Sequence, residues 1–125
     1  MKTKEKVELG DFQTPFDLAR EIVQLLKSMQ VSPSIVVEPT CGLGNFLKAS
    51  IATFGSDVKY YGFDINLDYV EKTKDSLATA NGVECEIKCQ NFFEQDWKTF
   101  FTTLPDNILV IGNPPWVTNS ALIPF

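Results

Sequence analysis

The sequence predicts an α/β fold built on a doubly wound parallel sheet of about four strands with flanking helices. Short runs rich in β-branched and aromatic residues alternate with longer segments whose apolar residues recur at helical spacing. The first such run leads into a glycine loop. The last, residues 108–111, is wholly apolar, which is typical of a central strand covered on both faces. A chain of 125 residues has room for one domain.

The first ordered element is expected to be a helix over residues 15–29. Residues 1–10 are charged and without period, so we interpret them as a flexible arm, and we expect order over residues 11–125. Thr14 is a candidate side-chain N-cap, and Pro15 suits the first helical position. The apolar stripe predicted to face the core is Leu18, Ile22, Leu25, Leu26 and Met29.

Two strand-then-helix units follow. Residues 35–37 predict a buried strand, and the helical spacing of Leu47, Ile51 and Phe54 predicts a helix that Gly55 ends. Lys59–Asp64 predicts the second strand.

The second unit is completed by a helix that Asn66 caps. Its inner face is expected to hold Val70, Thr73, Leu77 and Ala80, and Asn81-Gly82 should stop it.

The remaining elements repeat the alternation. Residues 84–88 predict a more exposed strand, with Cys85 and Ile87 on its inner face. Helical spacing from Phe93 to Leu104 predicts a helix, and residues 108–111 predict the fourth strand.

The unusual polar and glycine-rich segments each follow a strand. They are residues 38–45, Asp64, Asn91-Phe92 and residues 113–116. Because ligands of doubly wound sheets bind beyond the carboxyl ends of the strands, these segments should converge on one rim.

Composition excludes several kinds of chemistry. The chain has no histidine, which excludes Ser/His/Asp and Cys/His catalysis. The three cysteines are neither an even disulfide set nor a paired zinc motif, so no metal site is expected and a reducing cytoplasm is the expected location. Sixteen acidic residues against eleven basic ones argue against a surface that wraps nucleic-acid phosphates. No apolar run approaches the ~20 residues of a membrane span.

The glycine loop lacks the signatures of diphosphate sites. Gly42 and Gly44 are followed by Leu47 where a dinucleotide fingerprint needs its third glycine, and no Gly-Lys pair exists for a phosphate loop. Glu38 would repel phosphate, but it could hold an amine or ribose hydroxyls. Asp64 stands where such folds hold a ribose. The structural alternatives are a tight turn for the glycines and a carboxylate at a helix N-terminus for Asp64.

The motif Asn113-Pro114-Pro115-Trp116 suits a planar ligand with an exocyclic amine. Consecutive prolines stiffen the loop and leave its carbonyls projecting. The Asn113 side chain adds an acceptor, and Trp116 adds a flat face for stacking.

Taken together, these motifs resemble the N-terminal half of S-adenosylmethionine-dependent DNA adenine N6-methyltransferases of restriction–modification systems. The resemblance rests on Phe12 to Pro15, Val37 to Phe46, Gly62 to Asn66, Asn91 to Phe93 and Asn113 to Trp116, in that order. It implies an incomplete Rossmann-like methyltransferase sheet, with residues 11–125 a partial methyltransferase domain that ends just after the Asn113 motif.

The resemblance also implies roles for the cofactor residues. Thr14 and Pro15 would hold the methionine end of S-adenosylmethionine, and Asp64 would accept the ribose hydroxyls. Ile65 would pack on the adenine, which Asn91 and Phe92 would contact, with Asn91 replacing the usual aspartate. The amino acid and ribose portions would meet the loop that contains Glu38, Pro39, Thr40, Cys41, Gly42 and Gly44.

For the target base, the resemblance implies that Asn113 and the Pro114 carbonyl accept hydrogen bonds from N6 of a flipped-out adenine. Pro115 would stiffen the same loop, and Trp116 would stack on the base. Methyl transfer would then be direct.

Other interpretations stay open. The same grip could serve a protein glutamine or an RNA base. The chain could also be a truncated or partner-dependent cofactor-binding fragment that is inactive alone, with DNA held by parts outside it. The strand at residues 108–111 would leave one edge uncovered, which favours self-association or pairing with a second polypeptide.

Overall fold

The fold alternates strands with helices, as the sequence predicts. The computed structural model describes residues 13–78, 80 and 82–115. Its elements in chain order are α2 (Phe16–Ser28), β1 (Ile35–Glu38), α3 (Asn45–Phe54), β2 (Lys59–Asp64), α4 (Leu67–Leu77), β3 (Glu84–Cys89), α5 (Trp97–Thr102) and β4 (Ile108–Val110). The predicted arm at residues 1–10, Asn81 and Trp116 lie outside the described residues.

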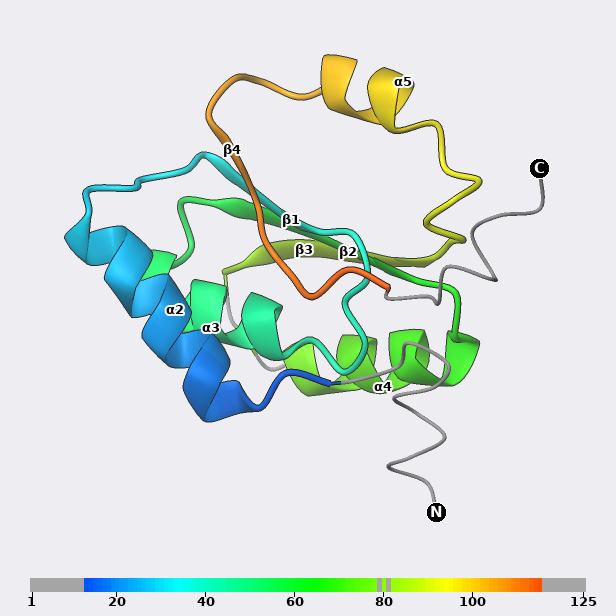
Figure 1. The fold of residues 1–125 in the computed structure, drawn as a ribbon, viewed down its shortest axis with the longest axis horizontal. Helices are drawn as coiled ribbons and strands as arrows, with labels where there is room; N and C mark the ends of the chain where they lie inside the picture. The colour runs from blue at the N-terminus through cyan, green and yellow to red at the C-terminus, as the bar shows by residue number, and fades with distance from the viewer. Residues whose placement is uncertain (1–12, 79, 81, 116–125) are drawn as a thin grey trace.

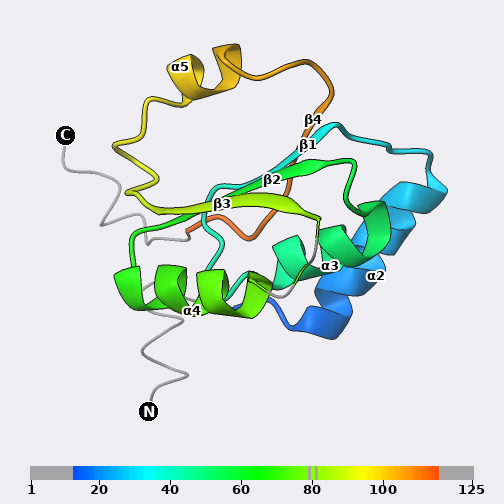
Figure 2. The same cartoon turned by 180° about the vertical axis from the view of Figure 1, so that it is seen from behind.

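The four strands form one parallel sheet in the order β3-β2-β1-β4. Helices α2, α3 and α4 lie on one side of the sheet and α5 lies on the other, as both views show (Figure 1, Figure 2). Helices on both faces of a parallel sheet confirm the predicted doubly wound α/β class.

Alternate side chains of the strands fill two cores. Val36, Tyr60 and Ile87 point to the side of α3 and α4, where they pack with Leu47 and Val70. On the opposite face, the strand residues pack under α5. They are Ile35, Val37, Tyr61 and Phe63, and they meet Trp97, Phe100, Phe101 and Leu104. Strand β1 is buried along its whole length, and so it anchors the loop that follows it.

The start of α2 differs from the prediction. Pro15, with φ −59° and ψ 146°, occupies the cap position itself, and no side chain caps the helix. Thr14 therefore lies one residue too early to be the N-cap, and its backbone carbonyl accepts a hydrogen bond from Asn45 Nδ2 at 2.8 Å.

The buried face of α2 also differs. The helix packs on α3 through Ala19 and Val23, with Ala49 opposite, while Leu25 and Met29 of the predicted stripe are 58% and 64% exposed. Leu18 is exposed too. Small residues at the contact let the two helices approach closely. Ile22 of the predicted stripe packs against this cluster and Leu26 is half-buried, whereas the other three residues lie toward solvent.

Two helices are shorter than predicted. Helix α4 has the predicted Asn66 cap but ends at Leu77, so Ala80 lies outside it. Helix α5 begins only at Trp97, because Asp96 Oδ1 accepts from Thr99 N and starts the helix there. Phe93 lies before that cap and is 66% exposed.

Strand β4 is less covered than predicted. Its residues are half-buried or exposed, with Val110 51% exposed, so the prediction of a central strand covered on both faces is wrong for the described part of the chain. The reason is its position, since among the described strands β4 pairs only with β1. The predicted uncovered edge is present in the same set of strands. Across the described residues, no helix has the length and apolar character to span a bilayer.

Candidate functional site

A cavity of about 390 Å³ lies where the segments that follow the four strands meet the segment before α2. The predicted site residues that line it are Thr14, Glu38, Thr40, Cys41, Gly42, Asp64, Ile65, Asn91, Phe92, Asn113 and Pro115. The predicted convergence on one rim is therefore confirmed. Pro15, Pro39, Gly44 and Pro114 are not among the lining residues.

The glycine loop owes its shape to two left-handed residues. Gly42 has φ +53° and Gly44 has φ +81°, a conformation that residues with a side chain rarely adopt. A Cβ on Gly44 would also lie 2.7 Å from Thr73 Cγ2. The buried Thr73 hydroxyl donates to the Gly42 carbonyl at 2.9 Å. Gly44 therefore sets the backbone conformation of the loop on the side that packs against Thr73, and it does not line the cavity.

Asp64 joins the end of β2 to this loop. Its Oδ2 accepts from Gly42 N at 2.8 Å, and its Oδ1 accepts from Asn66 N at 2.9 Å. Each carboxylate oxygen has two acceptor positions, so each can accept one further hydrogen bond. The carboxylate is therefore both a structural link and a presented acceptor.

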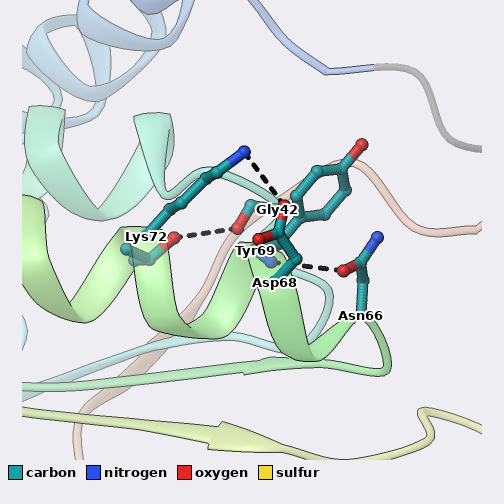
Figure 3. A network of polar contacts seen from close by, with 6 residues as sticks. Gly42, Asn66, Asp68, Tyr69 and Lys72 are labelled. Atoms are coloured by element: carbon teal, nitrogen blue, oxygen red, sulfur yellow. Dashed lines mark hydrogen bonds and ion pairs between the residues drawn. The ribbon is translucent and has the colours of Figure 1, made fainter.

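The cap of α4 lies beside Asp64. Asn66 Oδ1 accepts from Tyr69 N at 3.2 Å, as Figure 3 shows together with the exposed ion pair of Lys72 with Asp68 at 2.9 Å. Both Asn66 and Tyr69 line the cavity.

The segment before α2 is held against the glycine loop by two hydrogen bonds. Gln13 Oε1 accepts from Leu43 N at 3.2 Å, and Asn45 donates to the Thr14 carbonyl. A side chain on Gly42 would collide with Gln13. Gln13 was not among the predicted site residues, although it belongs to the Phe12 to Pro15 motif on which the resemblance rests.

Glu38 is the buried carboxylate of the site. It is 3% exposed, and its Oε1 accepts from Leu47 N at 3.3 Å. Burial raises the pKa of the Glu38 carboxyl well above its usual range; the Leu47 amide partly offsets this, and the negative charge of Asp64 adds to it. A cation bound beside this carboxyl would favour its ionised form.

The loop after β4 is tied to the glycine loop. Thr40 Oγ1 donates to the Asn113 carbonyl at 3.0 Å. A Cβ on Gly112 would lie 3.1 Å from Glu38 Cγ, so the loop after β4 also lies against the end of β1. These contacts hold Asn113 at the cavity wall.

The loop after β3 forms the remaining wall. Asn91 Oδ1 accepts from Phe93 N at 2.9 Å, and the indole Nε1 of Trp97 donates to the Phe92 carbonyl at 2.8 Å. Trp97 also meets Phe63 edge-to-face, with ring centroids 5.3 Å apart. The aromatic layer under α5 therefore holds this wall in place.

Comparisons with known proteins identify the family of this sequence. A model of the family described as N-6 DNA Methylase matches residues 1–121. The chain belongs to the N-6 DNA Methylase family.

Within the family, the chain is 45% identical to the type II methyltransferase M.NspV of Nostoc sp. over 117 residues. That alignment covers 94% of this chain and 24% of the relative, so the chain spans about a quarter of the relative's length.

Solved structures agree with the fold of this N-6 DNA Methylase chain. The modification subunit of a putative type I restriction enzyme from Vibrio vulnificus matches with a TM-score of 0.57 at 18% identity, covering 81% of this chain and 23% of that one. An RNA methyltransferase from Salinibacter ruber in complex with S-adenosyl-L-homocysteine matches with a TM-score of 0.55 at 20% identity, covering 68% and 54%. The sheet is therefore of the Rossmann-like methyltransferase type.

The thiol of Cys41, which lines this cavity, is not activated as a nucleophile. Cys41 lines it, but burial first, and then the nearby Glu38 and Asp64 charges, raise the pKa of its thiol far above the usual range. A thiol with a raised pKa is a poor nucleophile. Among the described residues, no group of three or more Cys, Asp or Glu side chains could hold a metal ion.

Proposed function

We propose that this chain carries the cofactor site and the catalytic motif of a site-specific DNA adenine N6-methyltransferase of a restriction–modification system. The observation that carries the proposal is the single cavity in which the glycine loop, Asp64, the Asn91 loop and Asn113 meet. Family membership and the identity to a type II methyltransferase support it.

S-adenosylmethionine fits the cavity in size and in chemistry. Pockets for ligands of this size are about 300–1,000 Å³, and this one is about 390 Å³. When bound, the cofactor supplies an electrophilic methyl group on a sulfonium. Asp64 gives the wall acceptors and negative charge toward a cationic ligand with hydroxyls, and Glu38 adds a buried carboxyl whose ionised form such a ligand would favour. The neighbour that holds S-adenosyl-L-homocysteine has the same fold.

Different residues would bind different parts of S-adenosylmethionine. The open acceptor positions of Asp64 suit ribose hydroxyls, and Glu38 suits the amine of the methionine end. Ile65 is 65% exposed beside Asp64 and offers an apolar surface for a base. Thr14 closes the methionine side, because Asn45 ties its carbonyl to the glycine loop.

The loop after β4 would hold the target amine. The Asn113 side-chain oxygen would accept a hydrogen bond from one N–H group of adenine N6, and the Pro114 carbonyl would accept one from the other. The lone pair of an aromatic amine is delocalised into its ring. Hydrogen bonds to both N–H groups favour a pyramidal nitrogen, whose lone pair then points out of the plane of the ring. Trp116, which lies outside the described residues, would stack on the base. Positioning and electrostatics would carry the reaction without a covalent enzyme intermediate.

The wider assembly follows from charge and from the uncovered sheet edge. With 16 acidic and 11 basic residues, this chain is not a basic clamp, so DNA would be held by parts of the enzyme other than this chain. Among the described strands, β4 leaves one edge unpaired, and we expect this edge to favour self-association or a second polypeptide. Such an enzyme would act in the cytoplasm.

Substitution of Asn113 by alanine tests the assignment. We expect Asn113→Ala to abolish methyl transfer to adenine by the complete enzyme, because one of two acceptors for N6 is lost, while cofactor affinity stays within a few-fold of wild type. Transfer of a radiolabelled methyl group to DNA, RNA and protein acceptors measures the first, and calorimetry measures the second. Undiminished transfer by the variant, or transfer to RNA or protein in place of DNA, would sink the proposal.

A further inference from the structure

Thr73 of α4 contacts the glycine loop without lining the cavity. Its side chain is fully buried, and it is not one of the lining residues. Its hydroxyl donates to the Gly42 carbonyl at 2.9 Å. The thiol of Cys41 lies 3.7 Å from the same oxygen and is a weak donor. Of these two donors, the Thr73 hydroxyl makes the stronger hydrogen bond.

This hydrogen bond fixes the orientation of the peptide group between Gly42 and Leu43. The peptide bond is trans, so its N–H points away from its carbonyl. On that opposite side, Leu43 N donates to Gln13 Oε1 at 3.2 Å, and Gln13 lines the cavity. The Thr73 hydroxyl and the Gln13 side chain therefore hold one peptide group from its two ends.

Gly42 is a residue whose backbone needs such support. Its φ is +53°, and glycine populates positive and negative φ about equally readily. Asp64 Oδ2 accepts from Gly42 N at 2.8 Å, which fixes the peptide group before Gly42. Thr73 fixes the peptide group after it. Without the hydroxyl, that second group would be free to rotate while the bond to Asp64 stays in place.

We propose that Thr73 is a positioning residue for the cofactor, because its hydroxyl holds the glycine loop in its binding shape before the ligand arrives. This inference rests on the proposed function. A loop that is already ordered loses less conformational entropy on binding, so cofactor affinity should depend on a hydroxyl that does not touch the ligand. Asn66 N donates to Asp64 and Asn66 caps α4, so the two groups that hold Gly42 belong to one connected unit.

Two substitutions at this position separate the hydroxyl from the shape of the side chain. Thr73→Val keeps the shape and removes the hydroxyl, so the full chain should bind S-adenosylhomocysteine about five- to tenfold more weakly in a calorimetric titration, the equivalent of one hydrogen bond. Thr73→Ser keeps the hydroxyl and removes the methyl group that packs against Gly44. Its affinity should stay within about twofold of wild type.

Tyr60→Phe is the matched control for a purely structural effect. The buried Tyr60 hydroxyl donates to the Gly55 carbonyl at 2.7 Å and to the Ser50 carbonyl at 3.3 Å. Neither Gly55 nor Ser50 lines the cavity. Like Thr73→Val, this variant loses a buried hydroxyl that bonds to a glycine carbonyl, and urea unfolding should show a loss of stability in both. Only Thr73→Val should also lose affinity, whereas Tyr60→Phe should stay within about twofold of wild type.

Three results would overturn this inference and leave the cofactor assignment standing. They are wild-type affinity in Thr73→Val, an equal loss in Thr73→Ser, which would assign the effect to packing, and an equal loss in Tyr60→Phe, which would assign it to general stability. Failure of the wild-type chain to bind S-adenosylhomocysteine at all would remove the cofactor assignment and this inference with it.

Discussion

The buried carboxyl of Glu38 gives a prediction that is specific in sign. Glu38 is 3% exposed and its Oε1 accepts from one backbone amide, that of Leu47. Burial raises the pKa of this carboxyl in the folded protein well above the ordinary value of about 4.3 that it regains on unfolding. Between those two pKa values, the unfolded chain has lost the proton and the folded chain retains it.

The free energy of unfolding must therefore fall as pH rises through this interval. One proton of difference costs about 1.4 kcal/mol per pH unit, from the ordinary pKa upward until the folded pKa is reached. Glu38→Gln keeps the acceptor for the Leu47 amide and removes the titrating group. We expect the variant to gain about 1.4 kcal/mol per pH unit over wild type in that interval.

Urea unfolding of both proteins at several pH values from 5 to 8 measures this difference. Asp96 works in the opposite direction, because hydrogen bonds from Thr99 lower the pKa of its carboxyl, so its contribution is present above the unfolded pKa and lost at low pH. That contribution is common to both proteins and cancels in the difference. Equal pH slopes for wild type and Glu38→Gln would refute the reasoning.

Two further substitutions test the links that shape the cavity. Asp64→Asn replaces one acceptor oxygen by an NH₂ group that faces a backbone amide. We therefore expect a loss of about 1–3 kcal/mol in the free energy of unfolding and weaker cofactor binding. An unchanged urea midpoint would contradict the link that Asp64 makes to the glycine loop. Trp97→Phe keeps an aromatic ring and removes the donor to the Phe92 carbonyl. It should lower the free energy of unfolding by about 1 kcal/mol and weaken cofactor binding measured by calorimetry. Unaltered binding would show that the wall formed by the loop after β3 does not depend on the indole.

Local signals in the sequence predicted much of the fold. Strand β2 has the predicted bounds, Asn66 caps α4 through its own side chain, and Gly55 ends α3, because each of these features depends on neighbours in the sequence. The rim was predictable as well, since parallel strands place their carboxyl ends together.

The errors share a physical cause. Turns, helix caps and tertiary contacts compete with the apolar spacing, and the spacing alone does not reveal them. Periodicity extended helix α5 back to Phe93, but the turn at Asn91 and the cap at Asp96 start it at Trp97. The α2 stripe was wrong for Leu18, Leu25 and Met29, because the close contact of Ala19 and Val23 with helix α3 sets the rotation of α2.

Gln13 belongs to the Phe12 to Pro15 motif, but its contact could not be predicted from that motif. Its side chain bonds to Leu43 N, thirty residues further along the chain, and only the folded structure brings the two together.

The central claim is that the cavity at the carboxyl ends of the strands binds S-adenosylmethionine. Calorimetric titration of the chain with this cofactor tests it most directly, alongside Asp64→Asn and Asn113→Ala. We predict saturable binding at one site, at least several-fold weaker in Asp64→Asn and within a few-fold of wild type in Asn113→Ala. Absence of saturable binding, or equal affinity in wild type and Asp64→Asn, would contradict the account.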